Sequence, residues 1–469
     1  MIEGHSIAET LQNNIESLGA IRHLLVLAIG SVLLLMIGLF TSSKKALVGI
    51  FATILLLAFF VMPNEITQYF SGQLASTLLG TKVQVVSLVA TLGLLLFNSF
   101  WNKPFEYYFL LLALLLGSLL MTVSRHLLIL YLAIELTSVI SYMLTAFNFN
   151  KSGIEGAFKY LLVGLVSSAF MLYGISLLYG ATGSFFVSTL TGPLEIVGAL
   201  LLLVGALFKV SVFPLHTWVP NTYQSAPTDL VYYLSVVPKI CAFVLLGYLV
   251  EAFNHSIITT ALWVFATATV VVGTFGAVVQ RKVKRLIGYG AIAHSGFLLP
   301  FLLMPEFFAG NQFLFYVVIY AIMNGAIFYF IAIHERESDL DLDALSGMGK
   351  TNPLLGATII VTLLALIGLP PTAGFSIKLV LFSEIWSSFT SDQGVYALTF
   401  FTVGIISTAI SLYYYLRIPY HYYLKDEGSD QLKIPSKHLV VSTFLAVVLL
   451  WFFIQPEILD NFVLTIPKP

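Results

Sequence analysis

Residues 207–220 read LFKVSVFPLHTWVP, and this stretch decides the fold. Pro214 follows Lys209 by little more than a helical turn, inside an apolar run that begins near residue 193. Proline removes a backbone donor and clashes with the preceding turn of a helix. Irregular backbone at membrane depth persists only where it lines protein or a polar cavity. The stretch therefore predicts a broken membrane helix with a lysine beside the break.

A second interrupted run lies further along the chain, in LIGLPPTAGFSIKLVLF at residues 366–382. Pro370, Pro371 and Gly374 come just before Lys378. Two interrupted hydrophobic segments in corresponding positions are the sequence sign of a transporter built from internal repeats. Because the breaks lie five apolar runs apart, we interpret them as equivalent points of two five-helix inverted repeats.

The composition indicates a membrane protein. Of the 469 residues, 58% are hydrophobic and 10% are charged, and the mean hydropathy is +0.95. A soluble domain has about 25% charged residues, so most of this surface must face lipid. The net charge of −1 gives no field that would favour nucleic acid. The single cysteine, Cys241, excludes a disulfide framework, a thiolate zinc site and a cysteine-ligated iron–sulfur cluster.

Fourteen apolar runs approach the length of about 20 residues that crosses the hydrocarbon core. They lie near residues 21–40, 45–62, 83–101, 104–122, 125–147, 154–180, 193–217, 228–250, 257–279, 286–304, 311–333, 353–386, 395–417 and 438–455. The predicted fold is an all-α integral membrane protein of about 14 transmembrane helices, with helices 7 and 12 broken. We divide it into helices 1–3 (1–103), a first repeat of helices 4–8 (104–250), a second repeat of helices 9–13 (251–417), and a loop with the last helix (418–469).

Basic residues sort unequally between the connections. If the runs alternate in direction, loops after odd-numbered runs hold fourteen basic residues, Lys284 among them, and the other side holds four, Lys82 among them. The positive-inside rule then places both termini outside the cytoplasm. The remaining four lysines lie within or against apolar runs: Lys159, Lys209, Lys239 and Lys378.

These four lysines need a reason to be where they are. A lysine at the bilayer centre costs about 2.5–3.5 kcal/mol on insertion scales. Lys239 follows Pro238 midway along its run, too far from either end for snorkelling. Lysine can lose its proton when it is desolvated, whereas arginine stays charged. We therefore interpret Lys209, Lys239 and Lys378 as members of a proton relay; the alternative for Lys209 is that it only donates to carbonyls freed by the break.

Glu135 lies in the middle of LLILYLAIELTSVISYML, with no opposite charge within a helical turn. Its partner must come from another helix, and Lys209 is the predicted one, since proton relays need such acid–base pairs. The alternative is a neutral acid that only fixes packing. Glu155 and Lys159 are four residues apart and share a helix face, so either an interfacial ion pair or a functional pair explains them.

Two histidines complete the candidates. His294, in LIGYGAIAHSGFLL, titrates near neutral pH and is placed to bridge two lysines. His216 lies beside the first break. The alternative for each is a hydrogen-bonded core residue, and neither has a second ligand at metal-binding spacing. The acidic stretch ESDLDLDALSGMGK lacks the glycine and closing glutamate of a calcium loop, so we expect a solvated loop or a subunit contact.

The segment FKVSVFPLHTWVPNTYQSAPT resembles the signature of the proton-translocating antiporter-like subunits of respiratory complex I and of multisubunit cation/proton antiporters. Five more segments match this family in the same order: LAIELTSVISYML, IEGAFKY, VPKI, KRLIGYGAIAHSGFLL and GLPPTAGFSIKL. The resemblance covers roughly residues 100–420. The helix count, the segment TYQSAP and a lysine at position 378 favour the branch known as subunit N of bacterial NADH–quinone oxidoreductase, although Ser225 replaces the glycine usual in that branch.

This resemblance implies roles and partners. Glu135 and Lys209 would be the family's paired glutamate and lysine, Lys239 and His294 the connecting relay, and Lys378 the terminal lysine. Glu155 and Lys159 match a further family pair. The chain would bind no cofactor, while NADH, FMN, iron–sulfur clusters and quinone would belong to other subunits of a hetero-oligomeric complex I in the bacterial cytoplasmic (inner) membrane.

Two alternatives stay open from the sequence. One is a subunit of a cation/proton antiporter or a membrane-bound hydrogenase, with the same relay and different partners. The other is a structural membrane subunit whose buried charges only hold the bundle together.

Overall fold

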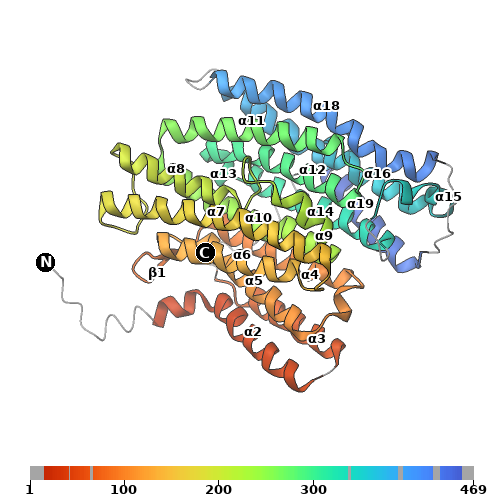
Figure 1. The fold of residues 1–469 in the computed structure, drawn as a ribbon, viewed down its shortest axis with the longest axis horizontal. Coiled ribbons are helices and arrows are strands. Elements are labelled where there is room, and N and C mark those ends of the chain that lie inside the picture. The colour runs from red at the N-terminus through yellow and green to blue at the C-terminus, as the bar shows by residue number, and fades with distance from the viewer. Residues whose placement is uncertain are drawn as a thin grey trace.

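The computed structural model describes residues 15–41, 43–63, 67–335, 340–388, 394–425 and 434–456, and it is almost entirely helical. In Figure 1, α2 and α3 lie along one edge of the bundle, α18 lies along the opposite edge, and α10 lies between them. One short antiparallel hairpin, β1 (Gln68–Tyr69) and β2 (Leu74–Ala75), connects α3 to α4. Both chain ends lie outside the described residues, and so does the prediction that the two termini are on the non-cytoplasmic side.

The helices follow one another along the chain with short connections. They are α2 (Arg22–Phe40), α3 (Lys44–Phe60), α4 (Leu78–Leu92), α5 (Phe105–Val123), α6 (Leu127–Thr145), α7 (Lys151–Thr182), α8 (Pro193–Leu207), α9 (Trp218–Ser225), α10 (Thr228–Phe253), α11 (Ser256–Val278), α12 (Val283–Leu298), α13 (Pro305–Ala309), α14 (Asn311–His334), α15 (Met348–Thr351), α16 (Pro353–Ile367), α17 (Ala373–Ser388), α18 (Gly394–Leu424) and α19 (Ser436–Ile454). Four short 3-10 helices join them: η1 (Gly93–Leu96), η2 (Phe100–Asn102), η3 (Leu299–Leu303) and η4 (Asp343–Leu345).

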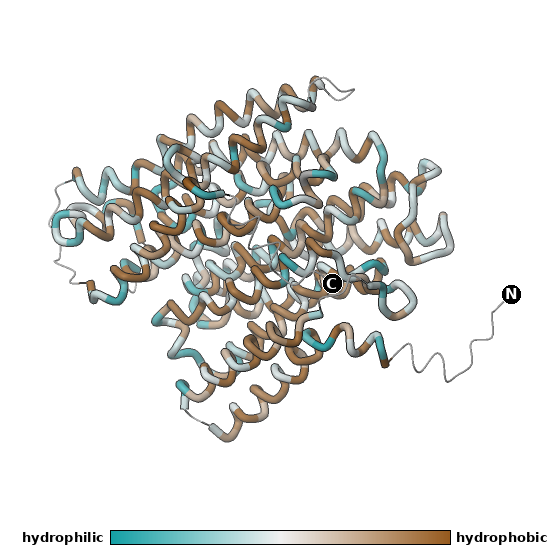
Figure 2. The backbone as a smooth tube through the Cα atoms, turned by 180° about the vertical axis from the view of Figure 1, so that it is seen from behind, coloured by the Kyte–Doolittle hydropathy of each residue, from teal (hydrophilic) through white to brown (hydrophobic). Residues whose placement is uncertain are grey.

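The predicted helical membrane bundle is confirmed. Each of the fourteen apolar runs forms a helix or a broken pair of helices, and in the described residues eleven helices are long and apolar enough to cross a membrane. The others are shorter because the two broken runs are divided and α3 has only 17 residues. Figure 2 shows apolar colour along the helices and polar colour gathered at helix ends and connections.

Both predicted breaks are present. In the first, α8 ends at Leu207 and regular helix resumes at Trp218; Ser211, between them, has a φ of +60°. In the second, α16 ends at Ile367 and α17 begins at Ala373; here Gly368 has a φ of +86°. Both turns use the left-handed region, which only glycine adopts without strain.

The centre of the bundle is α10. Its apolar window is buried over its whole length, and it contacts α4, α5 and α14. Pro238 lies inside it without ending it. A membrane helix that is surrounded by protein can carry polar side chains at mid-depth because neighbouring helices supply partners.

The assignment of Lys82 and Lys284 to aqueous loops is wrong. Thr77 caps the first turn of α4 by accepting from Gly80 N, so this helix starts before the predicted run and carries Lys82 inward, where it is 7% exposed. Lys284 lies in the first turn of α12 and is 4% exposed. The described residues therefore bury five lysines: Lys82, Lys209, Lys239, Lys284 and Lys378.

Candidate functional site

Lys209 lies at the first break, just after α8 ends. Its side chain is buried, and Nζ is 3.4 Å from Ser138 Oγ on α6. α8 ends at Leu207, seven residues before Pro214, so Lys209 lies in the interrupted stretch that precedes the proline. The predicted position of Lys209 beside an interrupted helix is thus what the structure has.

Glu135 is half-buried on α6 and accepts a hydrogen bond from Ser168 Oγ on α7. In the described structure it makes no direct ion pair with Lys209, the partner predicted for it. Ser138, three residues after Glu135 on the same helix face, is the group that contacts Lys209. A serine hydroxyl both donates and accepts, so it can connect the two charged groups.

Lys239 lies in the middle of α10 and is 1% exposed. Its ammonium donates to the carbonyl oxygen of Ala291 on α12 at 3.1 Å and to Tyr320 Oη on α14 at 3.4 Å. The Tyr320 ring centroid is 5.7 Å away, within the range of a cation–π contact. Within the described residues, these neutral partners solvate the ammonium and no ion pair is formed.

Two serine hydroxyls link the first break to Lys239. Ser211 Oγ, in the break, is 3.5 Å from Ser295 Oγ on α12. Ser295 Oγ donates at 3.0 Å to the carbonyl oxygen of Ala291, which also accepts from Lys239. Exchangeable protons are therefore present between the broken helix and α10.

His294 lies one turn beyond Ala291 on α12. Its Nδ1 is 2.9 Å from Tyr316 Oη, and its ring centroid is 5.6 Å from that of Tyr320. The charges of Lys378 and Lys239 both act on the imidazole. The predicted role of His294 as a bridge between two lysines stays a prediction.

Lys378 is 5% exposed on α17, the helix after the second break. Its Nζ donates at 2.7 Å to the carbonyl oxygen of Ile367 and at 3.5 Å to Thr408 Oγ1, and lies 4.7 Å from the centroid of the Phe297 ring. A Cβ on Gly368 would lie 2.6 Å from Lys378 Cδ. The break thus supplies both an acceptor for the ammonium and space for its stem.

The secondary candidates lie apart from this line of groups. Glu155 and Lys159 form an ion pair of 2.6 Å on α7, and their side chains are exposed on the surface of the isolated chain. His216 is buried near the first break with its ring 5.7 Å from that of Phe213. Its Nδ1 has no hydrogen-bond partner within the described residues. The relay roles suggested for these three residues stay predictions.

Sequence reasoning missed a buried ion pair and a buried acid. Lys284 Nζ is 2.5 Å from Glu335 Oε1, beside the end of α14. Asp229, in the first turn of α10, is fully buried and accepts from Tyr107 Oη at 2.9 Å. The available signal for Lys284 was its position two residues before a predicted run and ten before His294.

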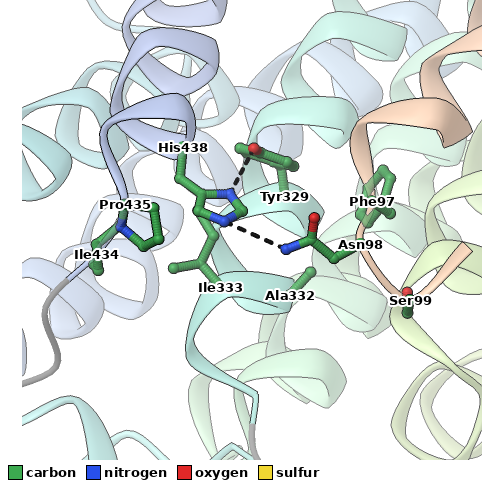
Figure 3. A pocket seen from close by; sticks show the side chains of 9 residues that line it. All are labelled: Phe97, Asn98, Ser99, Tyr329, Ala332, Ile333, Ile434, Pro435 and His438. Atoms are coloured by element: carbon green, nitrogen blue, oxygen red, sulfur yellow. Dashed lines mark hydrogen bonds between the residues drawn. The ribbon is translucent and has the colours of Figure 1, made fainter. Parts of the chain in front are cut away.

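A cavity of about 150 Å³ lies between α14 and α19 (Figure 3). His438 reaches into it, with its ring nitrogens 2.8 Å from Tyr329 Oη and 3.4 Å from Asn98 Nδ2. The cavity is lined by Phe97, Asn98, Ser99, Tyr329, Ala332, Ile333, Ile434, Pro435 and His438. No predicted site residue lines it. Across the described ranges, no group of three or more His, Cys, Asp or Glu side chains could hold a metal ion.

Known proteins resemble this chain along most of its length. The NADH-quinone oxidoreductase subunit N of Chlorobium chlorochromatii is 36% identical over 343 residues, 68% of this chain and 66% of that relative. The NADH-quinone oxidoreductase subunit 14 of Thermus thermophilus is 34% identical over 399 residues, 79% of this chain and 87% of that relative. One chain in the solved structure of respiratory complex I from Thermus thermophilus with bound aureothin superposes with a TM-score of 0.81 at 30% identity, covering 93% of this chain and 98% of that one.

A family model places the similarity on the site itself. The model described as "NADH:quinone oxidoreductase/Mrp antiporter, TM" matches residues 124–408, which include every site residue from Glu135 to Lys378. These residues also contain both broken helices. The chain belongs to the antiporter-like transmembrane family of NADH:quinone oxidoreductases and Mrp antiporters, in the branch of the subunit N sequences.

Proposed function

We propose that this chain is a proton-translocating membrane-arm subunit of an NADH–quinone oxidoreductase. Protons would move through Glu135, Lys209, Lys239, His294 and Lys378, driven by quinone reduction in other subunits. The observation that carries the proposal is the set of buried amines and one imidazole inside the bundle, each with a hydroxyl group within 3.5 Å.

The chemistry follows from the neighbours of each group. Lys239 and Lys378 have neutral partners, so each amine can be occupied by a proton or empty without stranding a buried counter-charge. A proton on one lysine repels a proton on the other, and His294 would carry protons between them. Such mutual repulsion moves protons in steps when a neighbour changes charge.

Glu135 supplies the control at one end. A negative charge on Glu135, one helical turn from the Ser138 hydroxyl that contacts Lys209, would attract the Lys209 ammonium. A shift of a few ångströms between α6 and the first break would weaken that attraction and release the Lys209 proton. Proton release from Lys209 and proton transfer between the later groups make and break only bonds to hydrogen.

The proposed function also needs cofactors, a quinone site and neighbouring subunits that other chains would supply. We infer that NADH, FMN, iron–sulfur clusters and quinone are bound by partner subunits and that the other membrane-arm subunits flank this chain. The exposed Glu155–Lys159 pair supports a neighbour at α7, because charged side chains are costly against lipid. We further propose the bacterial inner membrane as the location, with both termini on its non-cytoplasmic side.

Replacement of Lys209 or Glu135 by alanine in the assembled complex tests the proposal. Proton pumping per electron in membrane vesicles should fall sharply, while native gels show normal assembly. Lys45→Ala is the matched control, because Lys45 is exposed at the start of α3. Normal pumping per electron in both site variants would contradict the relay, and loss of assembly in both would favour a purely structural role.

A further inference from the structure

The cavity shown in Figure 3 lies where three segments of the bundle meet. Its walls come from the loop after η1, the last turns of α14 and the start of α19. Asn98, Ser99 and Pro435 are exposed, so the cavity reaches the surface of the chain. Among the described residues that line it, none is acidic. The cavity therefore lacks the side chains that would hold a cation and is open to a ligand of the opposite charge.

The polar groups of the cavity have a fixed order of donors and acceptors. Lys437 Nζ donates at 3.1 Å to Asn98 Oδ1, which turns Asn98 Nδ2 toward His438 Nε2 at 3.4 Å. An amide nitrogen only donates, so His438 Nε2 accepts and Nδ1 donates to Tyr329 Oη at 2.8 Å. The hydroxyl proton of Tyr329 is then available to a ligand.

The cavity thus presents donors in excess of acceptors. Besides the Tyr329 hydroxyl, Lys437 keeps two ammonium hydrogens beyond the one that it gives to Asn98. Ser99 adds a second hydroxyl at the exposed edge of the cavity. A phosphate group has several acceptor oxygens and a negative charge, and hydrogen bonds between charged partners are the strongest that proteins make. The donor set therefore fits a phosphate.

Lysines lie along the loop that forms one wall of the cavity. Lys44 Nζ donates at 3.0 Å to the carbonyl oxygen of Asn102 in this loop, Lys103 follows it, and Lys437 lies against Asn98 within it. Ion pairs of Lys44, Lys103 or Lys437 with an acid are absent from the described part of the chain. Basic pockets between membrane helices on the cytoplasmic side typically bind anionic lipid head groups. The positive-inside rule assigns this end of the helices to that side.

An exposed apolar face continues from Lys437 along α19. The large side chains at helical spacing from Lys437 are between 49% and 68% exposed; they are Val440, Phe444, Val447 and Trp451. The other face of α19 packs on α14, α16 and α17. Acyl chains can cover the exposed face while a headgroup lies at Lys437, whereas inorganic phosphate leaves it uncovered. This continuity favours a lipid over a free anion.

We propose that the cavity binds the headgroup of an anionic phospholipid, whose acyl chains lie along the exposed face of α19. The phosphate accepts hydrogen bonds from Lys437, from the Tyr329 hydroxyl and from Ser99. The bound lipid connects the loop after η1, the end of α14 and the start of α19, so it stabilises the folded chain. No covalent bond changes, and the site does not depend on proton transfer by the relay.

Thermal unfolding of the full chain in detergent, with added short-chain lipid, tests the proposal. A ligand that binds only the folded state raises the unfolding midpoint in proportion to its occupancy. Dioctanoyl phosphatidylglycerol should raise the midpoint saturably, and dioctanoyl phosphatidylcholine and inorganic phosphate should have little effect. In Lys437→Gln the apparent Kd for phosphatidylglycerol should rise about tenfold, because a hydrogen bond to a charged group is lost. Lys151→Gln, which removes an exposed lysine at the start of α7, is the matched control and should keep the wild-type Kd.

A second variant tests the cavity without changing any charge. Ala332 lines the cavity, so Ala332→Leu should fill part of it and weaken phosphatidylglycerol binding. A wild-type Kd in Lys437→Gln overturns the proposal, and if that variant does not fold, a wild-type Kd in Ala332→Leu overturns it. Equal stabilisation by phosphatidylcholine would show that acyl chains alone bind, and an equal shift with inorganic phosphate would show a small-anion site. Either result would also overturn the proposal of an anionic lipid.

Discussion

Lys378 Nζ donates a 2.7 Å hydrogen bond to the carbonyl oxygen of Ile367, the residue at which α16 ends. The last carbonyls of a helix have no partner within that helix. An ammonium placed against one of them is stabilised by the negative end of the helix dipole. The second break therefore provides a neutral, oriented site in which Lys378 can hold a proton without a carboxylate beside it.

Lys378→Arg should block proton transfer while leaving the fold intact. Arginine keeps the positive charge and can still donate to Ile367, but it does not release its proton in a protein. We expect pumping per electron, measured by a pH-sensitive dye in vesicles, to fall sharply with normal assembly. Wild-type pumping in this variant would show that Lys378 need not titrate.

Gly368→Ala should disturb the position of Lys378 by straining the backbone of the second break. Gly368 has a φ of +86°, and the added Cβ would meet Lys378 Cδ at 2.6 Å. A non-glycine residue in this region costs about 1–3 kcal/mol, so the variant should lose its folded state at a lower temperature in detergent and pump less well. Gly49→Ala is the matched control, because a Cβ there has open space around it. Equal effects of the two substitutions would contradict this account.

Both breaks could be predicted from the sequence, because a proline or a lysine inside an apolar run is costly unless the helix is interrupted or lined by polar groups there. The fourteen apolar runs could also be predicted to be helices, since a membrane-spanning segment must form its backbone hydrogen bonds within itself. Lys82 and Lys284 could not be placed, because each lies near the end of a run where a loop and a first helical turn have the same composition. The position of Lys82 depends on the Thr77 cap, which starts α4 before the apolar run. The position of Lys284 depends on its partner Glu335, which lies 51 residues further along the chain.

The candidate site was predictable as a set of residues and less so as a set of contacts. The prediction of Glu135 as the partner of Lys209 followed from charge alone. The structure instead puts Ser138 against Lys209, 71 residues away in sequence, and Ser168 against Glu135. Serine is common in membrane helices and carries no charge signal, so its position in a chain of polar contacts depends on packing that the sequence does not display.

Tyr320→Phe should impair pumping without loosening the bundle. The ring remains to pack against His294, but the hydroxyl 3.4 Å from Lys239 Nζ is lost. We expect pumping per electron to drop several-fold at nearly unchanged thermal stability. In the control Tyr232→Phe, the lost bond to the Ala90 carbonyl should cost about 1 kcal/mol of stability and leave pumping normal. The reverse pattern would remove Tyr320 from the relay.

Asp343→Asn should reveal that the Asp343 carboxylate makes a small, pH-dependent contribution to the stability of the fold. A hydrogen bond from Lys425 at 2.6 Å holds the pKa of the Asp343 carboxyl below its ordinary value of 3.8, and the His421 and Arg281 charges act in the same direction. A depressed folded-state pKa stabilises the fold above the ordinary pKa, and this contribution is lost as pH falls through the depressed value. Because Asp343 is more than half exposed, the difference from wild type at pH 7 should stay under about 1 kcal/mol. Thermal unfolding in detergent should show that difference shrinking below pH 3.8. A difference that grows on acidification would refute the assignment.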